Sequence, residues 1–236
     1  MIRHTIGLAI VTGLAASAQA GIFSFASDVD QTSFTFTGFG SGVFDADDPT
    51  DILELYIDDD NGMLDPLIYS VEFEANFTID YAGSVDLGNG LFVHTYDLFG
   101  EFGYYNADTG APILTATIDN GALTALGTDT SWLSTSTVLG ADGNASDVTY
   151  FWNLADNPDY GLYNGASVGP ADDAAFTLTF LQSDSGSGVD IGSRTRLPLT
   201  NWVSEGSYSG SATFVPAPGS LALLAGAGLI LGRRRR

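Results

Sequence analysis

The fold is decided by one stretch of sequence, Tyr69-Ser-Val-Glu-Phe-Glu-Ala-Asn-Phe-Thr-Ile-Asp-Tyr81. Its odd positions carry Tyr, Val, Phe, Ala and Ile, whereas its even positions carry Ser, Glu, Asn, Thr and Asp. Successive side chains of a β-strand point to opposite faces of a sheet. The unbroken alternation therefore predicts one long strand with one face buried and the other in water.

The same alternation returns near the end of the chain, where Tyr208, Gly210, Ala212 and Phe214 alternate with Ser and Thr. Outside the two termini, no window keeps a helical period over more than ten residues. Clusters of Gly, Asn, Asp and Ser separate the predicted strands, as turns do. We therefore expect an all-β fold, a single antiparallel β-sandwich of the lectin-like jelly-roll type with roughly eight to eleven strands. Further strands are predicted over 34–37, 53–57, 91–99, 112–118, 148–152 and 174–181.

Charge is distributed unevenly along the chain. There are 29 acidic residues and 7 basic ones, all Arg, which gives a formal net charge of −22. Every acidic residue lies between Asp28 and Glu205, where the basic residues are Arg194 and Arg196. Such a body cannot neutralise phosphates, so nucleic-acid binding is excluded, and an anionic membrane surface would repel it. The absence of cysteine excludes disulfides, thiolate catalysis and cysteine metal sites.

The first 20 residues have the three-part layout of a secretory signal peptide. A positive charge precedes an apolar run over 6–16 that is too short to span a bilayer, and Ala18-Gln19-Ala20 supplies the small side chains that signal peptidase accepts. We expect an N-terminal signal helix, cleavage after Ala20 and a mature chain that begins at Gly21. An uncleaved helix buried in the fold is the alternative.

The last 22 residues, 215–236, also have three parts. Val215-Pro216-Ala217-Pro218 ends the preceding strand, because proline lacks an amide donor. A hydrophobic helix is predicted over 221–232. It would be ~18 Å long, whereas the hydrocarbon core of a bilayer is ~30 Å thick. With its flanking residues the helix would therefore just span the membrane, or it would anchor the protein there transiently. The last four residues are Arg233, Arg234, Arg235 and Arg236, and because positive flanks stay in the cytoplasm we expect the body to lie outside the inner membrane.

This tail resembles the PEP-CTERM sorting signal of Gram-negative and related bacteria. Val215, Pro216 and Pro218 match its motif, whereas Ala217 stands where the family usually has Glu. The resemblance implies processing by an exosortase-like membrane enzyme and a place at the cell surface or in the extracellular matrix of bacteria that make exopolysaccharide. A simple uncleaved tail anchor is the alternative. Leu197-Pro-Leu-Thr-Asn201 is similar to a sortase site, but a proline-marked strand or loop explains it more simply.

The body, 21–214, is expected to be one domain, and its candidate chemistry is sparse. His94 is the only histidine outside the predicted signal peptide, and its strand pattern favours a structural or surface role. Glu72 and Glu74 lie ~6.6 Å apart along one strand face, near the separation of paired glycosidase carboxylates. An alternating strand turns this face to solvent, so the simpler interpretation is that Glu72 and Glu74 are solvated surface side chains.

The candidate metal ligands are Asp58, Asp59, Asp60 and Asp65. Clustered carboxylates provide the hard oxygen ligands that Ca²⁺ prefers, but the spacing does not fit an EF-hand, and Asn61-Gly62 favours a hairpin turn. A second acidic loop is expected at Asp45, Asp47, Asp48 and Asp51. Calcium is thus the one cofactor that the sequence suggests.

Three functions follow from these observations. The first is a non-enzymatic structural or adhesive component associated with exopolysaccharide, with signal peptidase and an exosortase-like enzyme as processing partners. The second is a carbohydrate-binding module, with or without calcium. The third is a glycoside hydrolase that uses Glu72, Glu74 or Glu101. Trp132, Trp152 and Trp202 are either sugar-stacking platforms or core residues, the latter being the commoner outcome.

Overall fold

The computed structural model describes residues 19–26, 34–37, 43–47, 53–59, 64–140, 148–154, 165–166 and 173–214. Both predicted terminal helices and the whole sorting tail lie outside the described residues. Within these ranges the chain forms strands and turns and no helix, which confirms the predicted all-β class. It follows that they contain no helix able to cross a membrane.

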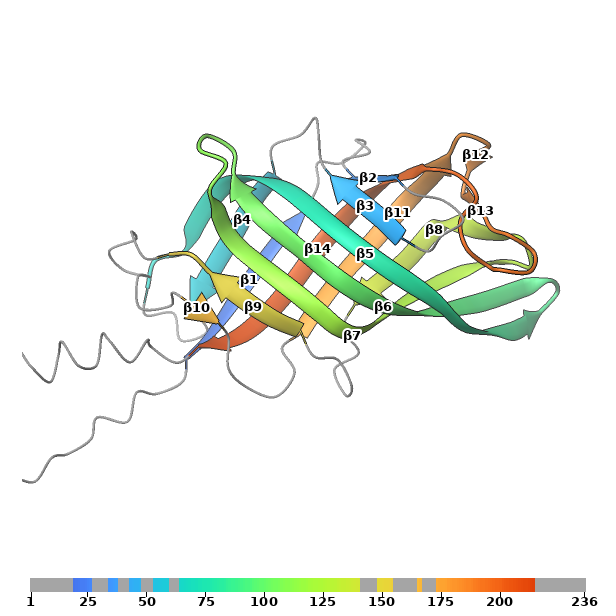
Figure 1. Ribbon diagram of the computed structural model, residues 1–236, viewed down its shortest axis with the longest axis horizontal. Coiled ribbons are helices and arrows are strands. Elements are labelled where there is room, and N and C mark those ends of the chain that lie inside the picture. Colours follow the sequence, from blue (N-terminus) through green and yellow to red (C-terminus); the bar gives the residue numbers. More distant parts are fainter. Residues whose placement is uncertain are drawn as a thin grey trace, which may run out of the picture.

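The strands carry the labels of Figure 1. The first seven are β1 Gln19–Ala26, β2 Phe34–Thr37, β3 Val43–Asp47, β4 Leu53–Asp59, β5 Leu67–Gly88, β6 Leu91–Asn106 and β7 Pro112–Thr128. The others are β8 Ser131–Gly140, β9 Val148–Trp152, β10 Gly165–Ala166, β11 Asp173–Ser183, β12 Gly186–Ser187, β13 Val189–Asp190 and β14 Trp202–Phe214.

Strand β5 contains the stretch that decided the fold. From Val71 to Ile79 its odd residues are buried and its even residues face outward, as the alternation predicted. The strand continues past the predicted end to Gly88, and β6 and β7 also extend beyond their predicted ends at Phe99 and Ile118. Irregularities in pairing explain the difference, because β-bulges near Gly83 and Gly100 interrupt the period-two pattern without ending the strand.

The described strands form one antiparallel sheet. From β4 to β8 each strand pairs with its neighbour in sequence. Strand β8 then pairs with β11, β11 with β14, β14 with β1, and β1 with β4, so the sheet closes on itself. Strands β2 and β3 bridge β14 to β5, and β9 pairs with the first half of β7.

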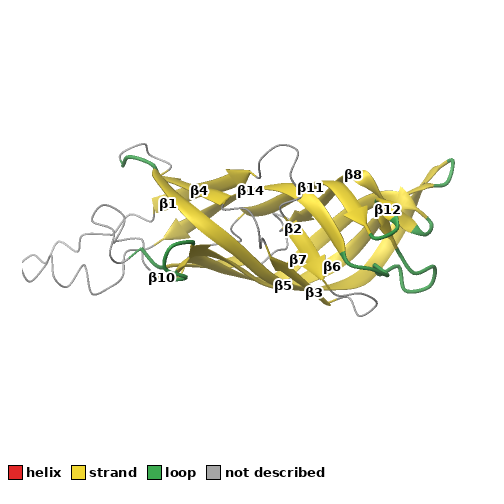
Figure 2. Ribbon diagram, turned by 90° about the horizontal axis from the view of Figure 1, so that it is seen from above, coloured by secondary structure: helices red, strands yellow, loops and turns green. Residues whose placement is uncertain are grey.

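Opposite sides of the closed sheet face each other across the core. Figures 1 and 2 show β5, β6, β7 and β9 on one side, and β1, β14, β11 and β8 on the other. Aromatic rings fill the space between them. Phe176 of β11 lies with its ring centroid 5.4 Å from those of both Phe73 and Phe102, and Phe23 of β1 lies 4.8 Å from Tyr150 of β9. Such edge-to-face contacts add to the free energy gained by burying each ring.

The three tryptophans belong to the core. Trp132, Trp152 and Trp202 are each at most 3 % exposed, and Trp202 stacks on Phe36 with ring centroids 3.8 Å apart. They are therefore core residues and not sugar-stacking platforms. The acidic loop expected at Asp45, Asp47, Asp48 and Asp51 is partly wrong, because Asp45 and Asp47 belong to β3 and pair in register with β5.

The two ends of the described body lie side by side. Gln19 pairs with Phe214 and Ala20 with Thr213, so β1 and β14 run together to the boundaries of the predicted terminal segments. Cleavage after Ala20 would leave the pairs from Gly21 to Ala26 intact.

Candidate functional site

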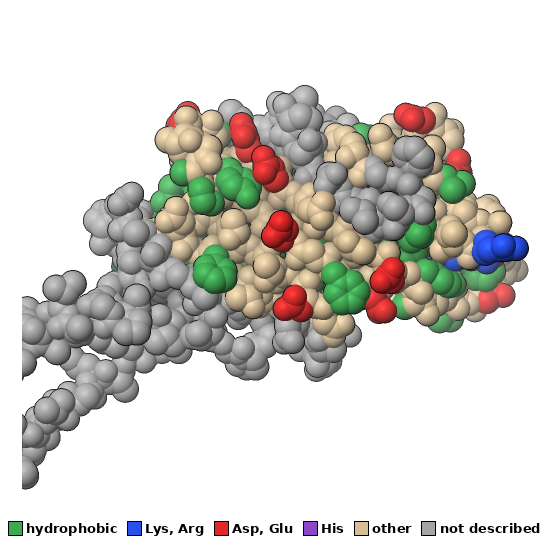
Figure 3. All heavy atoms as spheres, in the orientation of Figure 1, with side chains coloured by type: hydrophobic (Ala, Val, Ile, Leu, Met, Phe, Trp, Pro, Cys, Tyr) green, Lys and Arg blue, Asp and Glu red, His purple; other side chains and the backbone are tan. Residues whose placement is uncertain are grey.

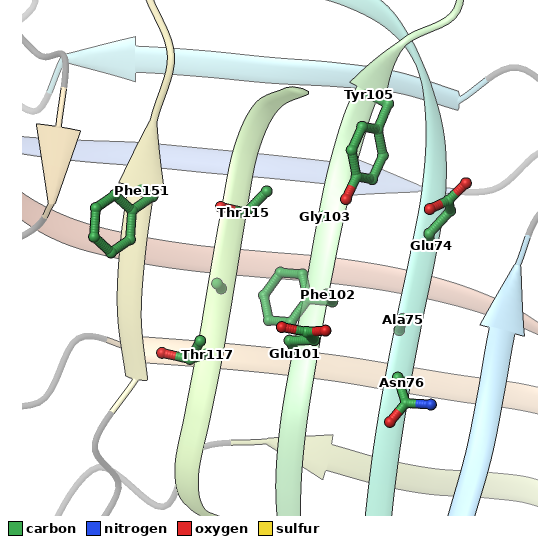
Figure 4. Close-up of a pocket in the computed structure, with 11 residues that line it drawn as sticks. Glu74, Ala75, Asn76, Glu101, Phe102, Gly103, Tyr105, Thr115, Thr117 and Phe151 are labelled. Atoms are coloured by element: carbon green, nitrogen blue, oxygen red, sulfur yellow. The ribbon is translucent and has the colours of Figure 1, made fainter. Parts of the chain in front are cut away.

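A hollow of about 490 Å³ lies on the outward face of β5, β6, β7 and β9. Figure 4 shows its polar and aromatic side chains projecting from these neighbouring strands. Its floor is made by Ala75, Phe102 and Ala116, whose side chains belong to the buried core. The outward-facing residues that line it are Glu74, Asn76, Glu101, Gly103, Tyr105, Thr115, Thr117 and Phe151.

The register of the sheet explains why these residues meet. Glu74 pairs with Gly103, Gly103 with Thr115, and Thr115 with Phe151, which makes one row across four strands. Adjacent strands are separated by ~4.8 Å, so the row extends over ~14 Å. A parallel row runs from Asn76 through Glu101 to Thr117.

Gly103 leaves a gap in the first row that Tyr105 fills. A Cβ atom placed on Gly103 would lie 2.8 Å from Cε2 of Tyr105 and 3.0 Å from its hydroxyl oxygen. The ring of Tyr105 therefore covers the bare backbone of Gly103, as Figure 4 shows. The ring can approach the backbone this closely only because residue 103 has no Cβ.

The phenol of Tyr105 interacts electrostatically with both carboxylates of the hollow. Its pKa is raised above the ordinary value, first by partial burial and then by the negative charges of Glu74 and Glu101. An anion next to other anions is unfavourable, so the neutral, hydrogen-bonding form of the phenol persists to higher pH. Tyr105 thus contributes both a ring face and a hydroxyl to the site.

Glu74 and Glu101 are diagonal neighbours on β5 and β6, a relation that places their Cβ atoms ~7–8 Å apart or slightly closer. Both side chains are exposed. Glu72 is also exposed on this face, opposite Tyr105, but it is not among the residues that line the hollow. Spacing along one strand suggested Glu72 and Glu74 as the carboxylate pair. In the structure the two carboxylates that share the hollow are instead Glu74 of β5 and Glu101 of β6.

The basic side chains that the structure describes lie away from this site. Figure 3 shows acidic side chains spread over the face, with basic side chains at one end of the molecule. In the part of the chain that the structure describes, the basic residues are Arg194 and Arg196, between β13 and β14. The guanidinium of Arg196 pairs with the carboxylate of Asp129 at 2.6 Å. The hollow is consequently an anionic surface.

His94 is buried within the fold and lies outside the hollow. Its Nε2 is 2.8 Å from the carbonyl oxygen of Thr128, which only accepts, so Nε2 carries the proton. Its Nδ1 then accepts a hydrogen bond from the hydroxyl of Ser84 at 2.6 Å. With both ring nitrogens satisfied and the side chain 0 % exposed, His94 has the structural role that its strand pattern favoured.

The candidate calcium ligands are only partly described. Asp58 lies on β4, in register with Ile22 of β1, and Asp65 is exposed before β5. The side chain of Asp59 and all of Asp60 lie outside the described residues. Among side chains that the structure does describe, no three acidic or histidine residues are grouped so as to hold a metal ion.

Most of the hollow was missed from sequence, because the rows depend on the pairing of four strands. Two signals were nevertheless readable. Phe151 stands between Tyr150 and Trp152, so a strand that buries those two must turn Phe151 outward. Similarly, Glu101, Gly103 and Tyr105 share the outward face of β6, where an aromatic residue is unexpected.

Comparison of the chain with protein-family models, with curated proteins and with solved structures found no match. The function is therefore inferred from the site and from the two terminal segments.

Proposed function

We propose that the protein is an exported bacterial surface or matrix component that binds extracellular polysaccharide through the hollow without altering it. Export is supported by the signal-peptide layout of 1–20 and by the PEP-CTERM-like tail of 215–236. Polysaccharide binding is supported by one observation above all, the row Glu74–Gly103–Thr115–Phe151 with the ring of Tyr105 lying over its glycine.

The chemistry of the row suits a sugar. Pyranose rings present apolar C–H faces to aromatic rings and hydroxyl groups to polar side chains. Phe151 is 52 % exposed at one end of the row, and the half-buried ring of Tyr105 lies toward the other. A single exposed Phe needs no explanation, but here it shares a hollow with carboxylates, an amide and two threonine hydroxyls.

The shape suits a chain of sugars more than a single one. The hollow is open along a row of ~14 Å, which exceeds the width of one pyranose ring. Phe99 lies one pleat beyond Glu101 on the same strand and face and is 38 % exposed, so a longer ligand has a further aromatic contact.

A lectin-like jelly-roll sandwich remains our proposal for the fold type. The face-to-face aromatic packing of β5 and β6 against β11 and β14 supports a sandwich. Two features are untypical of a jelly roll: β4 to β8 pair in sequence order, and the β14–β1–β4 pairings close the sheet on itself.

Glycoside hydrolysis is the second candidate. Glu74 and Glu101 are diagonal neighbours with Cβ atoms ~7–8 Å apart, a spacing from which their carboxyl groups can reach the ~6.5–9.5 Å separation of inverting glycosidases. Both side chains are exposed, however, whereas the general acid of such an enzyme is usually held in an apolar pocket. Binding without turnover is therefore the better account.

The test is calorimetric titration of the purified full-length protein with a panel of oligosaccharides, with Ca²⁺ and with chelator. Phe151→Ala and Tyr105→Ala should each weaken binding about tenfold, since loss of a stacking ring removes an aromatic contact and its buried area. The matched control is Phe180→Ala, because Phe180 is 58 % exposed on β11, outside the hollow. Equal weakening by all three variants, or no binding, would reject the hollow as the site.

Two further measurements separate the alternatives. Release of reducing ends by the wild type, abolished in a Glu74→Gln/Glu101→Gln variant, would favour the hydrolase.

The intact mass of the protein recovered from its host tests export. Loss of 1–20 and of the tail after Pro216–Pro218 supports an exosortase substrate, whereas retention of the four terminal arginines supports a simple tail anchor.

A further inference from the structure

We infer that the hollow selects glycans that carry free ammonium groups, that is, polymers of amino sugars without N-acetylation, over neutral and acidic glycans. This inference rests on the proposed function and narrows its ligand class. It combines the shape of the hollow, the charges on its rim and the position of Tyr105.

The charges on the rim favour a cationic ligand. Glu74 and Glu101 project into the same hollow from adjacent strands, and the other polar groups there are the amide of Asn76 and the hydroxyls of Thr115 and Thr117. No described basic side chain lines the hollow. A uronate would therefore meet two like charges with no counter-charge, whereas an ammonium group would meet two opposite ones.

Tyr105 adds a second contribution for a cation. Its ring lies over Gly103, and its pKa responds to the charges of both Glu74 and Glu101. An ammonium group held between these carboxylates therefore lies against the aromatic ring, where the ring quadrupole attracts it. A neutral sugar gains the stacking contact alone.

The oxygen atoms that the hollow offers suit an ammonium ion better than a metal ion. Ca²⁺ takes six to eight oxygen ligands, and the described acidic residues form no group of three that could hold a metal. An ammonium group has three donors, which two carboxylates and a neighbouring amide or hydroxyl oxygen satisfy. The flanking aromatic rings then select a sugar ring over a flexible lysine side chain.

The experiment compares a matched pair of ligands on the full-length protein. A β-linked glucosamine hexamer should bind roughly fivefold or more tightly than the same hexamer in its N-acetylated form, the size expected for two exposed ion pairs and a cation–π contact. A hexamer of galacturonic acid should bind more weakly than either. The preference for the amine should decline as salt is added, because salt screens exposed charges.

Two variants attribute the preference to the hollow. Glu74→Gln/Glu101→Gln should bring the ratio of the two affinities close to one while the N-acetylated hexamer still binds. The matched control is Asp80→Asn/Asp97→Asn, which removes two exposed charges from the same strands, β5 and β6, outside the hollow. It should keep most of the ratio.

Gly103→Ala tests the position of Tyr105 separately. The backbone of Gly103 is not in the left-handed region, so alanine is tolerated there, but its Cβ must displace the Tyr105 ring. The preference for the amine should fall although both carboxylates remain.

The outcomes distinguish the two proposals. Equal or tighter binding of the N-acetylated hexamer by the wild type would overturn the amino-sugar inference and leave polysaccharide binding intact. The absence of binding to any glycan would overturn both. Binding of polylysine as tight as that of the glucosamine hexamer, per charge, would show a general cation site and would also overturn the inference.

Discussion

Both carboxylates of the hollow affect the pKa of Tyr105. Partial burial and the carboxylates of Glu74 and Glu101 raise the pKa of its phenol. Removing the two negative charges in Glu74→Gln/Glu101→Gln should therefore lower that pKa toward the ordinary value near 10. Site-resolved NMR titration of the Tyr105 ring carbons in the variant and in the wild type measures the change. An unchanged Tyr105 titration would show that the carboxylates do not act on the ring.

The element that shapes the hollow is β6, and its bulge at Gly100 can be tested through stability. Gly100 has φ 141°, and a Cβ there would overlap the carbonyl oxygen of Asn76 on β5. Gly100→Ala should lower the free energy of unfolding by about 3 kcal/mol, since it combines backbone strain with a clash that only the sheet can relieve.

The control for this change is Gly83→Ala. Gly83 lies at a bulge of the β5–β6 pair, whereas Gly100 lies at one of the β6–β7 pair. At Gly83 an added Cβ meets nothing within 4 Å and φ is not in the left-handed region. Its free energy of unfolding should stay within about 0.5 kcal/mol of the wild type. Urea denaturation of both variants checks the pair, and equal losses would contradict the assigned role of the bulge.

Strands β5, β6 and β7 show which parts of the fold the sequence predicts and which it does not. Alternation in β5 predicted the strand, its buried face and hence the all-β class, because a period of two is a local property. The extents of β6 and β7 were underestimated, since bulges reset the pattern. The hollow itself was not predictable, because the row from Glu74 to Phe151 exists only once four strands are in register.

At the scale of the whole molecule, buried tyrosines make stability sensitive to alkali. Burial raises the pKa values of Tyr96 and Tyr104 in the folded state, and for Tyr104 the neighbouring Tyr150 adds to the effect. The folded protein thus keeps these phenols protonated where the unfolded chain ionises them. Their contribution is fully present below pH ~10 and is lost as the pH rises above it.

Denaturation monitored against pH checks this behaviour. The free energy of unfolding should fall steadily above pH ~10, and phenolate absorbance from the buried tyrosines should appear together with unfolding. Tyr104→Phe should reduce the slope, because phenylalanine has no proton to lose. A wild type whose stability is flat up to pH ~12 would contradict the buried state of these side chains.

The whole account depends on where a glycan binds, and amide chemical-shift mapping measures that most directly. When the glucosamine hexamer is titrated into the labelled full-length protein, we predict that the largest changes occur at Gly103, Thr115 and Phe151, with little change at Arg194 and Arg196 at the far end. Shifts concentrated away from β5, β6, β7 and β9, or no shifts at saturating ligand, would contradict the assignment of this hollow as the polysaccharide site.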